Sequence, residues 1–193
     1  MRVGVLALQG DFEAHLRALR SVGAEPQLVR VPAELERVDA LVLPGGESTA
    51  MLRGLERDAL EPALLRVLAS GRPVLGTCAG AILLAREVRG PAQRSLGALD
   101  IDVDRNAYGT QLDSFVCRAE TDDPASEFAG LECVLIRAPR ITRTGPGVRV
   151  LARVRSDPAL VSSGPIWAAT FHPELSTDTR VQRAWLRSAA SRA

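Results

Sequence analysis

The chain has 193 residues, of which 46% are hydrophobic; this can bury one core and is short for two, so a single domain spanning residues 1–193 is expected. Its formal charge of +1 excludes the basic excess with which proteins attract nucleic acids or anionic membranes. The apolar run at the start is too brief for a signal peptide and far below the roughly 20 residues of a membrane span, which predicts a cytoplasmic protein.

The first half of the sequence alternates between strand-like and helix-like segments. Strands are expected at residues 2–8, 26–31, 40–46 and 73–76, and helices at residues 12–22 and 59–69. Such alternation is typical of a parallel sheet with helices on both faces, which binds its ligands outside the carboxyl ends of the strands.

From about residue 95 the pattern changes to short strand-like pieces separated by turns. The pieces lie at residues 96–103, 114–120, 132–139, 148–154 and 166–171, and a last helix is expected near residues 178–190. The two halves together predict an α/β three-layer sandwich with a mainly parallel central sheet and some antiparallel additions.

The three cysteines have neither zinc-ligand nor CxxC spacing, so no metal site and no disulfide framework is predicted. Cys117 and Cys133 lie in apolar strand patterns, where inert core residues are expected. Cys78 differs, because it stands in the sequence Gly-Thr-Cys-Ala-Gly between a strand and a helix. Such a strained turn can present a nucleophile, and the helix N-terminus favours thiolate over thiol. The alternative is a small cysteine buried under the helix.

A possible partner for Cys78 follows the apolar run at residues 166–171. His172 and Glu174 are two residues apart, so in an extended segment they project to the same side. The carboxylate can then orient the imidazole while the imidazole faces the thiol, which outlines a Cys-His-Glu triad. Taken alone, His-Pro-Glu can also be a surface turn.

A third motif, Pro-Gly-Gly-Glu-Ser-Thr, begins at the end of the strand expected at residues 40–46. Gly45 and Gly46 can turn their backbone N–H groups toward an oxyanion, and Ser48 or Thr49 can begin a helix. The simpler interpretation of a Pro-Gly-Gly sequence is a turn without function.

The order Pro-Gly-Gly, Gly-x-Cys-x-Gly and His-Pro-Glu resembles the triad-type, class I glutamine amidotransferases, whose fold is flavodoxin-like. Finer matches resemble one branch of that family, the glutaminase subunits of pyridoxal 5′-phosphate synthase. The matching segments are residues 4–10, 44–49, 76–80, 105–115, 135–139 and 172–175. Two positions depart from the family: Ala14 replaces a frequent glutamate before His15, and Thr110 replaces a common arginine.

The resemblance implies that Cys78 attacks the side-chain amide of L-glutamine and that His172, aligned by Glu174, donates the proton with which ammonia leaves. Water then hydrolyses the glutamyl thioester. The resemblance also implies an oxyanion hole made by residues Gly45, Gly46 and Ala79, with Gln9 beside it.

The resemblance further implies the substrate-binding residues Gly46, Glu47, Ser48, Arg105, Ile136 and Arg137, the last two from a strand. Arg105 would meet the substrate carboxylate, although a solvated surface charge is the ordinary fate of an arginine. His15 is expected to be a packing or partner-contact residue. The chain is expected to bind no cofactor and to pass ammonia to the synthase subunit, a (β/α)₈ barrel. Alternatives are another ammonia acceptor, a γ-glutamyl hydrolase, or a non-catalytic binding module on the same fold.

Overall fold

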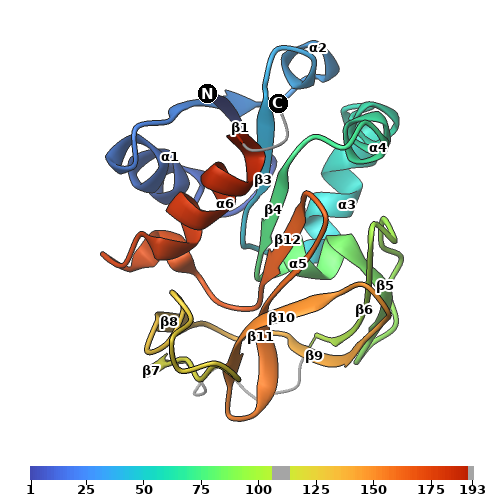
Figure 1. Cartoon of the computed structure of the whole chain (residues 1–193). Helices are drawn as coiled ribbons and strands as arrows, with labels where there is room; N and C mark the ends of the chain where they lie inside the picture. The colour runs from blue at the N-terminus through green and yellow to red at the C-terminus, as the bar shows by residue number, and fades with distance from the viewer. Residues whose placement is uncertain (106–113, 191–193) are drawn as a thin grey trace.

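The computed structural model describes residues 1–105 and 114–190. A seven-stranded sheet with the order β10-β11-β12-β4-β3-β1-β2 forms its centre (Figure 1). Its strands are β1 (Arg2–Leu6), β2 (Glu25–Val29), β3 (Ala40–Leu43), β4 (Val74–Thr77), β10 (Arg149–Val154), β11 (Asp157–Ser163) and β12 (Ile166–Ala169). The pairs β2-β1, β1-β3, β3-β4 and β4-β12 are parallel, whereas β11 runs antiparallel to β12 and to β10.

The order β2-β1-β3-β4-β12 is the flavodoxin-like order of five parallel strands, so this part of the fold prediction is confirmed. Every residue of β3, β4 and β12 is buried, as expected for central parallel strands that are covered on both faces. The chain therefore leaves β1, β3, β4 and β12 at one edge of the sheet, directly before the motifs at Gln9, Gly45, Cys78 and His172.

Helices cover both faces of this sheet. They are α1 (Phe12–Ser21), α2 (Pro32–Leu35), α3 (Ser48–Arg57), α4 (Glu61–Ala69), α5 (Ala79–Leu84), the short 3₁₀ helix η1 (Pro173–Leu175) and α6 (Arg180–Ala190). Figure 1 shows α1 and α6 on one side of the sheet and α3, α4 and α5 on the other. Each side has its own hydrophobic core, with Met51 and Leu64 in one and Phe171 and Trp185 in the other. The predicted three-layer sandwich is therefore confirmed.

Two smaller sheets lie beyond the carboxyl edge. They are β5-β6-β9, made of Ala85–Arg89, Leu99–Asp104 and Arg140–Thr144, and β7-β8, made of Phe115–Arg118 and Glu132–Leu135. The sequence did not predict β5, β9 or β11. Strand β5 follows α5 without an intervening turn residue, and β9 carries two arginines and two threonines among its five residues, which hides the apolar signal.

Several predicted elements were too long. The strand expected at residues 132–139 ends at Leu135, because Arg137 adopts a positive φ of 44° that no strand can continue. Within residues 105–115, positions 106–113, including Thr110, lie outside the described residues. The single-domain assignment for residues 1–193 remains a prediction.

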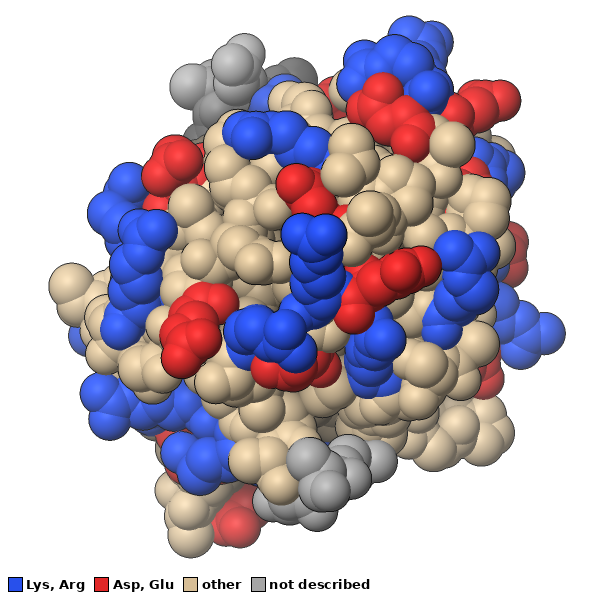
Figure 2. All heavy atoms as spheres, turned by 90° about the horizontal axis from the view of Figure 1, so that it is seen from above, with Lys and Arg blue, Asp and Glu red and all other residues tan. Residues whose placement is uncertain are grey.

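On the face shown in Figure 2, arginines and acidic side chains are interspersed rather than gathered by sign. Among the helices in residues 1–105 and 114–190, none combines the length and apolar character needed to cross a membrane.

Candidate active site

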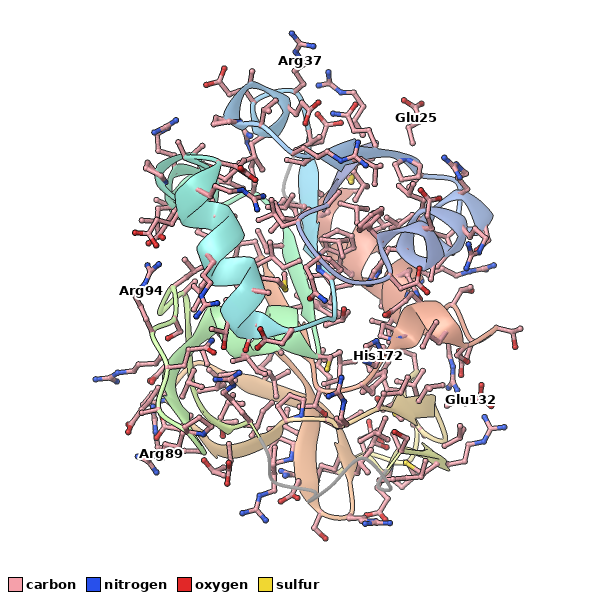
Figure 3. The ribbon with its side chains drawn as sticks, turned by 180° about the vertical axis from the view of Figure 1, so that it is seen from behind. Glu25, Arg37, Arg89, Arg94, Glu132 and His172 are labelled. Atoms are coloured by element: carbon pink, nitrogen blue, oxygen red, sulfur yellow. The ribbon has the colours of Figure 1, made fainter. Side chains whose placement is uncertain are left out.

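A cleft of about 380 Å³ lies where the central strands end. Ten of the predicted site residues line it: Gly45, Gly46, Glu47, Ser48, Cys78, Arg105, Ile136, Arg137, His172 and Glu174. Gln9 and Ala79, also predicted, are not among the lining residues. Asp11, Ile82 and Leu175 line the cleft without having been predicted. Figure 3 places His172 near the middle of the molecule, at the ends of the central strands.

Cys78 occupies the predicted elbow between β4 and α5. Its backbone has φ 47° and ψ −102°, a conformation that costs a residue with a side chain free energy and is typical of functional sites. Two glycines make the turn possible. A Cβ at Gly80 would meet the Leu43 carbonyl, and a Cβ at Gly76 would lie 2.7 Å from the Gly80 backbone. Strand and helix therefore approach closely enough to hold the Cys78 side chain at the cleft.

His172 and Glu174 meet through a different local structure from the predicted one. The extended segment was wrong: His172 caps η1, whose first residue, Pro173, has a ring-fixed φ that suits a helical start. In this turn the distance from His172 Nδ1 to Glu174 Oε1 is 2.7 Å. The two residues are paired as predicted, but by one turn of 3₁₀ helix.

The protonation of His172 follows from its neighbours. Burial lowers the pKa of the His172 imidazole, but hydrogen bonds to Cys78 and Glu174, together with their negative charges, raise it well above its usual value. Because Nδ1 donates to the carboxylate, Nε2 remains for the thiol. The raised pKa favours the imidazolium form of His172 beside Cys78.

The Gly45-Gly46 turn lies against the triad. A Cβ at Gly45 would collide with the His172 ring and lie 3.4 Å from Cys78 Cβ, so only glycine allows this approach. Gly46 has a φ of 147°. Gln9 Oε1 accepts a hydrogen bond from the Glu47 N–H. Gln9 thus holds the turn from outside the cleft instead of lining it.

The predicted substrate-binding residues at the start of α3 are joined to one another. Glu47 caps the helix: its carboxylate accepts hydrogen bonds from the Thr49 N–H at 2.9 Å and the Ala50 N–H at 2.7 Å. Arg105 Nη2 lies 3.2 Å from both Glu47 Oε1 and Thr49 Oγ1. Although partial burial raises the pKa of the Glu47 carboxyl, these N–H groups lower it more, so that it stays ionised.

Ile136 and Arg137 reach the cleft from the loop after β8, not from a strand as predicted. The Ile136 carbonyl lies 3.9 Å from Cys78 Sγ, within reach of a thiol donor. Both side chains are exposed at the cleft.

The surroundings of His15 were not predicted from the sequence. Its side chain in α1 is 3% exposed, and its Nε2 lies 3.2 Å from Thr77 Oγ1 and 3.4 Å from Glu174 Oε1. This burial fits a packing residue, one of the two roles expected for His15, but the polar contact with the predicted triad was not foreseen. The available signal was that His15 is one of only two histidines and lies on the apolar face of its helix.

Comparisons with known proteins show which family the chain resembles. The model of the SNO glutamine amidotransferase family matches residues 5–191. A protein from Koribacter versatilis (strain Ellin345), named pyridoxal 5′-phosphate synthase subunit PdxT, is 50% identical over 187 residues, or 97% of this chain and 95% of that protein. A protein of the same name from Thermotoga maritima is 46% identical over 96% of this chain and 98% of its own length. A crystal structure of a glutamine amidotransferase is similar with a TM-score of 0.89 and 43% identity, covering 97% of this chain and 98% of that chain.

Proposed function

The chain belongs to the SNO glutamine amidotransferase family, and we propose that it is the glutaminase subunit of a pyridoxal 5′-phosphate synthase. Its fold is the class I glutamine amidotransferase fold. The observation that carries the proposal is that Cys78, His172 and Glu174 line one cleft at the carboxyl edge of the sheet, with His172 Nδ1 2.7 Å from Glu174 Oε1. The reaction is hydrolysis of L-glutamine to L-glutamate and ammonia.

In the first half of the reaction, the Cys78 thiolate attacks the side-chain amide carbon of glutamine and forms a C–S bond. The carbonyl oxygen takes the negative charge. The His172 imidazolium gives its Nε2 proton to the amide nitrogen, the C–N bond breaks, and ammonia leaves. Because the pKa of His172 is raised, the imidazole stays protonated until it transfers this proton to the leaving amide nitrogen.

In the second half, the neutral His172 takes a proton from water while the water oxygen attacks the thioester carbon. The C–S bond breaks, glutamate leaves, and Cys78 returns as the thiolate beside an imidazolium. Glu174 stays ionised throughout and keeps Nδ1 protonated through its 2.7 Å contact.

The oxyanion is assigned to backbone donors. Ala79 is the first residue of α5, and the first N–H groups of a helix have no acceptor within the helix. The Gly45 carbonyl oxygen lies against Gly10, where a Cβ would collide with it, so the N–H of the same peptide, at Gly46, points the other way. Gln9 supports this orientation through the Glu47 N–H.

Substrate binding is assigned to Gly46, Glu47, Ser48, Arg105, Ile136 and Arg137. Arg105 uses one nitrogen on Glu47 and Thr49 and retains further N–H donors for the α-carboxylate of glutamine. Ser48 donates its hydroxyl to Gln93 Oε1 at 3.1 Å, so we assign substrate binding at this position to its backbone N–H.

The proposal includes a cytoplasmic location and a (β/α)₈-barrel synthase partner that receives the ammonia. The chain itself holds no cofactor, since the coenzyme is the product of the complex.

The test is turnover of glutamine by the purified chain with its synthase subunit, combined with labelling by a glutamine-like electrophile. Equal amounts of glutamate and ammonia and a single label on Cys78 are expected. Faster cleavage of γ-glutamyl peptides would indicate a γ-glutamyl hydrolase, and absence of both turnover and label would indicate a non-catalytic module.

A further inference from the structure

Two imidazoles face the same oxygen of Glu174. His172 Nδ1 lies 2.7 Å from Oε1, and His15 Nε2 lies 3.4 Å from that atom on the side of α1. His15 and Glu174 are almost fully enclosed, with side chains 3% and 1% exposed. Helix α1 packs directly on η1, which carries Glu174. The contact therefore joins the first helix to the triad in a place that water does not reach.

The contact determines which nitrogen of His15 carries a proton. An ionised carboxylate only accepts hydrogen bonds, so a bare Nε2 at 3.4 Å would place two lone pairs against each other without solvent between them. A protonated Nε2 makes the approach attractive. Thr77 Oγ1, 3.2 Å from the same nitrogen, is compatible with either arrangement because a hydroxyl both donates and accepts.

The carboxylate has little other support. Among the described residues, Glu174 Oε2 is buried and has no hydrogen-bond partner. A buried charge without partners is costly. Burial raises the pKa of the Glu174 carboxyl, but the neighbouring His15 and His172 lower it more, so that it remains below its usual value. Two imidazoles thus keep this carboxylate ionised and in place.

We propose that His15 is a positioning residue of the triad, whose Nε2–H holds the Glu174 carboxylate in the orientation that accepts the His172 Nδ1–H. His15 does not touch substrate; it acts through Glu174 on the direction in which His172 Nε2 points. The kinetic part of this inference rests on the proposed glutaminase function, whereas the proton on His15 does not.

The first experiment reads that proton directly. The chain has two histidines, so a sample with ¹⁵N-labelled histidine gives two sets of imidazole signals, and His15→Gln assigns them by removing one. A protonated Nε2 on His15 is expected. A His15 protonated at Nδ1 with a bare Nε2 would overturn the proposal, whether or not the protein hydrolyses glutamine.

The second experiment measures glutamine hydrolysis with the synthase subunit present. His15→Leu removes the donor at similar volume and should lower kcat roughly 10- to 100-fold, the effect of losing a hydrogen bond to a charged group. KM should change less than about twofold, because His15 does not contact the substrate. His15→Gln, which returns an N–H donor near the Nε2 position, should recover most of the lost rate.

Leu19→Ala is the matched control. Leu19 is a buried residue of the same helix, so this variant should lower the melting temperature and leave kcat within about twofold of the wild type. Unchanged kcat in His15→Leu, or a loss that His15→Gln does not recover, would refute the positioning role. If the wild-type chain itself did not hydrolyse glutamine, the proposed function would fail, and the proton on His15 would still decide the inference.

Discussion

The triad and the β5-β6-β9 sheet both place carboxylates beside cationic partners, but they do so in opposite surroundings. Around Glu174 the side chains are enclosed, whereas in the pairs Arg86–Asp100 and Arg89–Glu87 the arginine side chains are 67% and 59% exposed. Figure 3 shows this contrast between His172, near the middle of the molecule, and Arg89, which projects from its edge. Solvent screens the exposed pairs, so they contribute little, while the enclosed contacts set protonation and direction. A carboxylate beside a cationic partner can therefore fix the protonation and orientation of that partner only where water is excluded.

The sharpest test of this difference removes Cys78, the proposed nucleophile of the enclosed region. Cys78→Ala should reduce glutamine hydrolysis by roughly 10⁴-fold or more, because the covalent route is lost. The measurement is glutamate release with saturating synthase subunit.

Cys117→Ala is the control, since Cys117 lies opposite Cys133 in the β7-β8 ladder. Burial raises the pKa of the Cys117 thiol, and raises that of Cys133 to about 12, which fits the expectation of inert thiols. Cys117→Ala should keep the wild-type rate, and turnover retained by Cys78→Ala would exclude the mechanism.

A second variant tests the backbone at the cleft. Gly46→Ala should lower the rate roughly 10²- to 10³-fold, the effect of losing one oxyanion donor, because the new Cβ would collide with Gln9 Oε1. The measurement is kcat for glutamine with the synthase subunit present.

Gly71→Ala provides the comparison for that variant. Gly71 also has a positive φ, of 76°, but a Cβ there would meet nothing within 4 Å. Both variants should lose some stability to backbone strain, and only Gly46→Ala should lose its activity. Equal rates in the two variants would contradict the proposal that the Gly45-Gly46 turn supplies an oxyanion donor.

Asp178 is an intermediate case, with a side chain 16% exposed. Hydrogen bonds from Arg180 lower the pKa of the Asp178 carboxyl to about 2, against a smaller effect of burial. The pKa is lower in the folded chain, so the stabilisation is present above pH ~4 and is lost as the pH falls toward 2.

Asp178→Asn should therefore be less sensitive to acid than the wild type. Between pH 6 and pH 3 the free energy of unfolding of the wild type should fall by on the order of 1 kcal/mol more than that of the variant, allowing for solvent screening. Denaturant titrations at the two pH values measure this. Parallel decreases in the two proteins would show that Asp178 is not responsible.

The smallest effect is expected in the exposed region. Arg86→Ala removes the contact with Asp100, yet it should leave glutamine hydrolysis unchanged and shift the melting temperature by no more than about 3 °C. A much larger fall in the melting temperature, measured by thermal denaturation, would mean that the exposed ion pairs stabilise the fold. This would contradict the difference drawn between the exposed and the enclosed regions.

The sequence predicted what depends on local pattern. Apolar runs located the central parallel strands, and the small residues around Cys78 indicated the elbow, because both arise from neighbouring positions. The pairing of His172 with Glu174 was predicted on a wrong local structure, since Pro173 begins a 3₁₀ turn in place of an extended segment. Ile136 lies beyond the end of its strand because Arg137 adopts a positive φ. The sequence there contains no glycine or asparagine that would have predicted this conformation.

The contact of His15 with Glu174 could not be predicted from pattern at all. It joins a helix near the start of the chain to a turn near its end, and it exists only because α1 packs on η1. The contacts of Gln9 and Arg105 could not be predicted either, because both side chains contact Glu47, which is distant from them in the sequence. The motifs therefore indicate the proposed reacting groups, whereas only the tertiary structure shows which residues contact and orient them.

The most direct test of the central claim compares two sources of nitrogen for pyridoxal 5′-phosphate formation by the complex of this chain with its synthase subunit. With Cys78→Ala in the complex, formation from glutamine should cease, whereas formation from added ammonium salt should equal that of the wild-type complex. Formation from glutamine by the Cys78→Ala complex, or loss of the ammonium-dependent reaction as well, would contradict the assignment of this chain as the ammonia-supplying glutaminase.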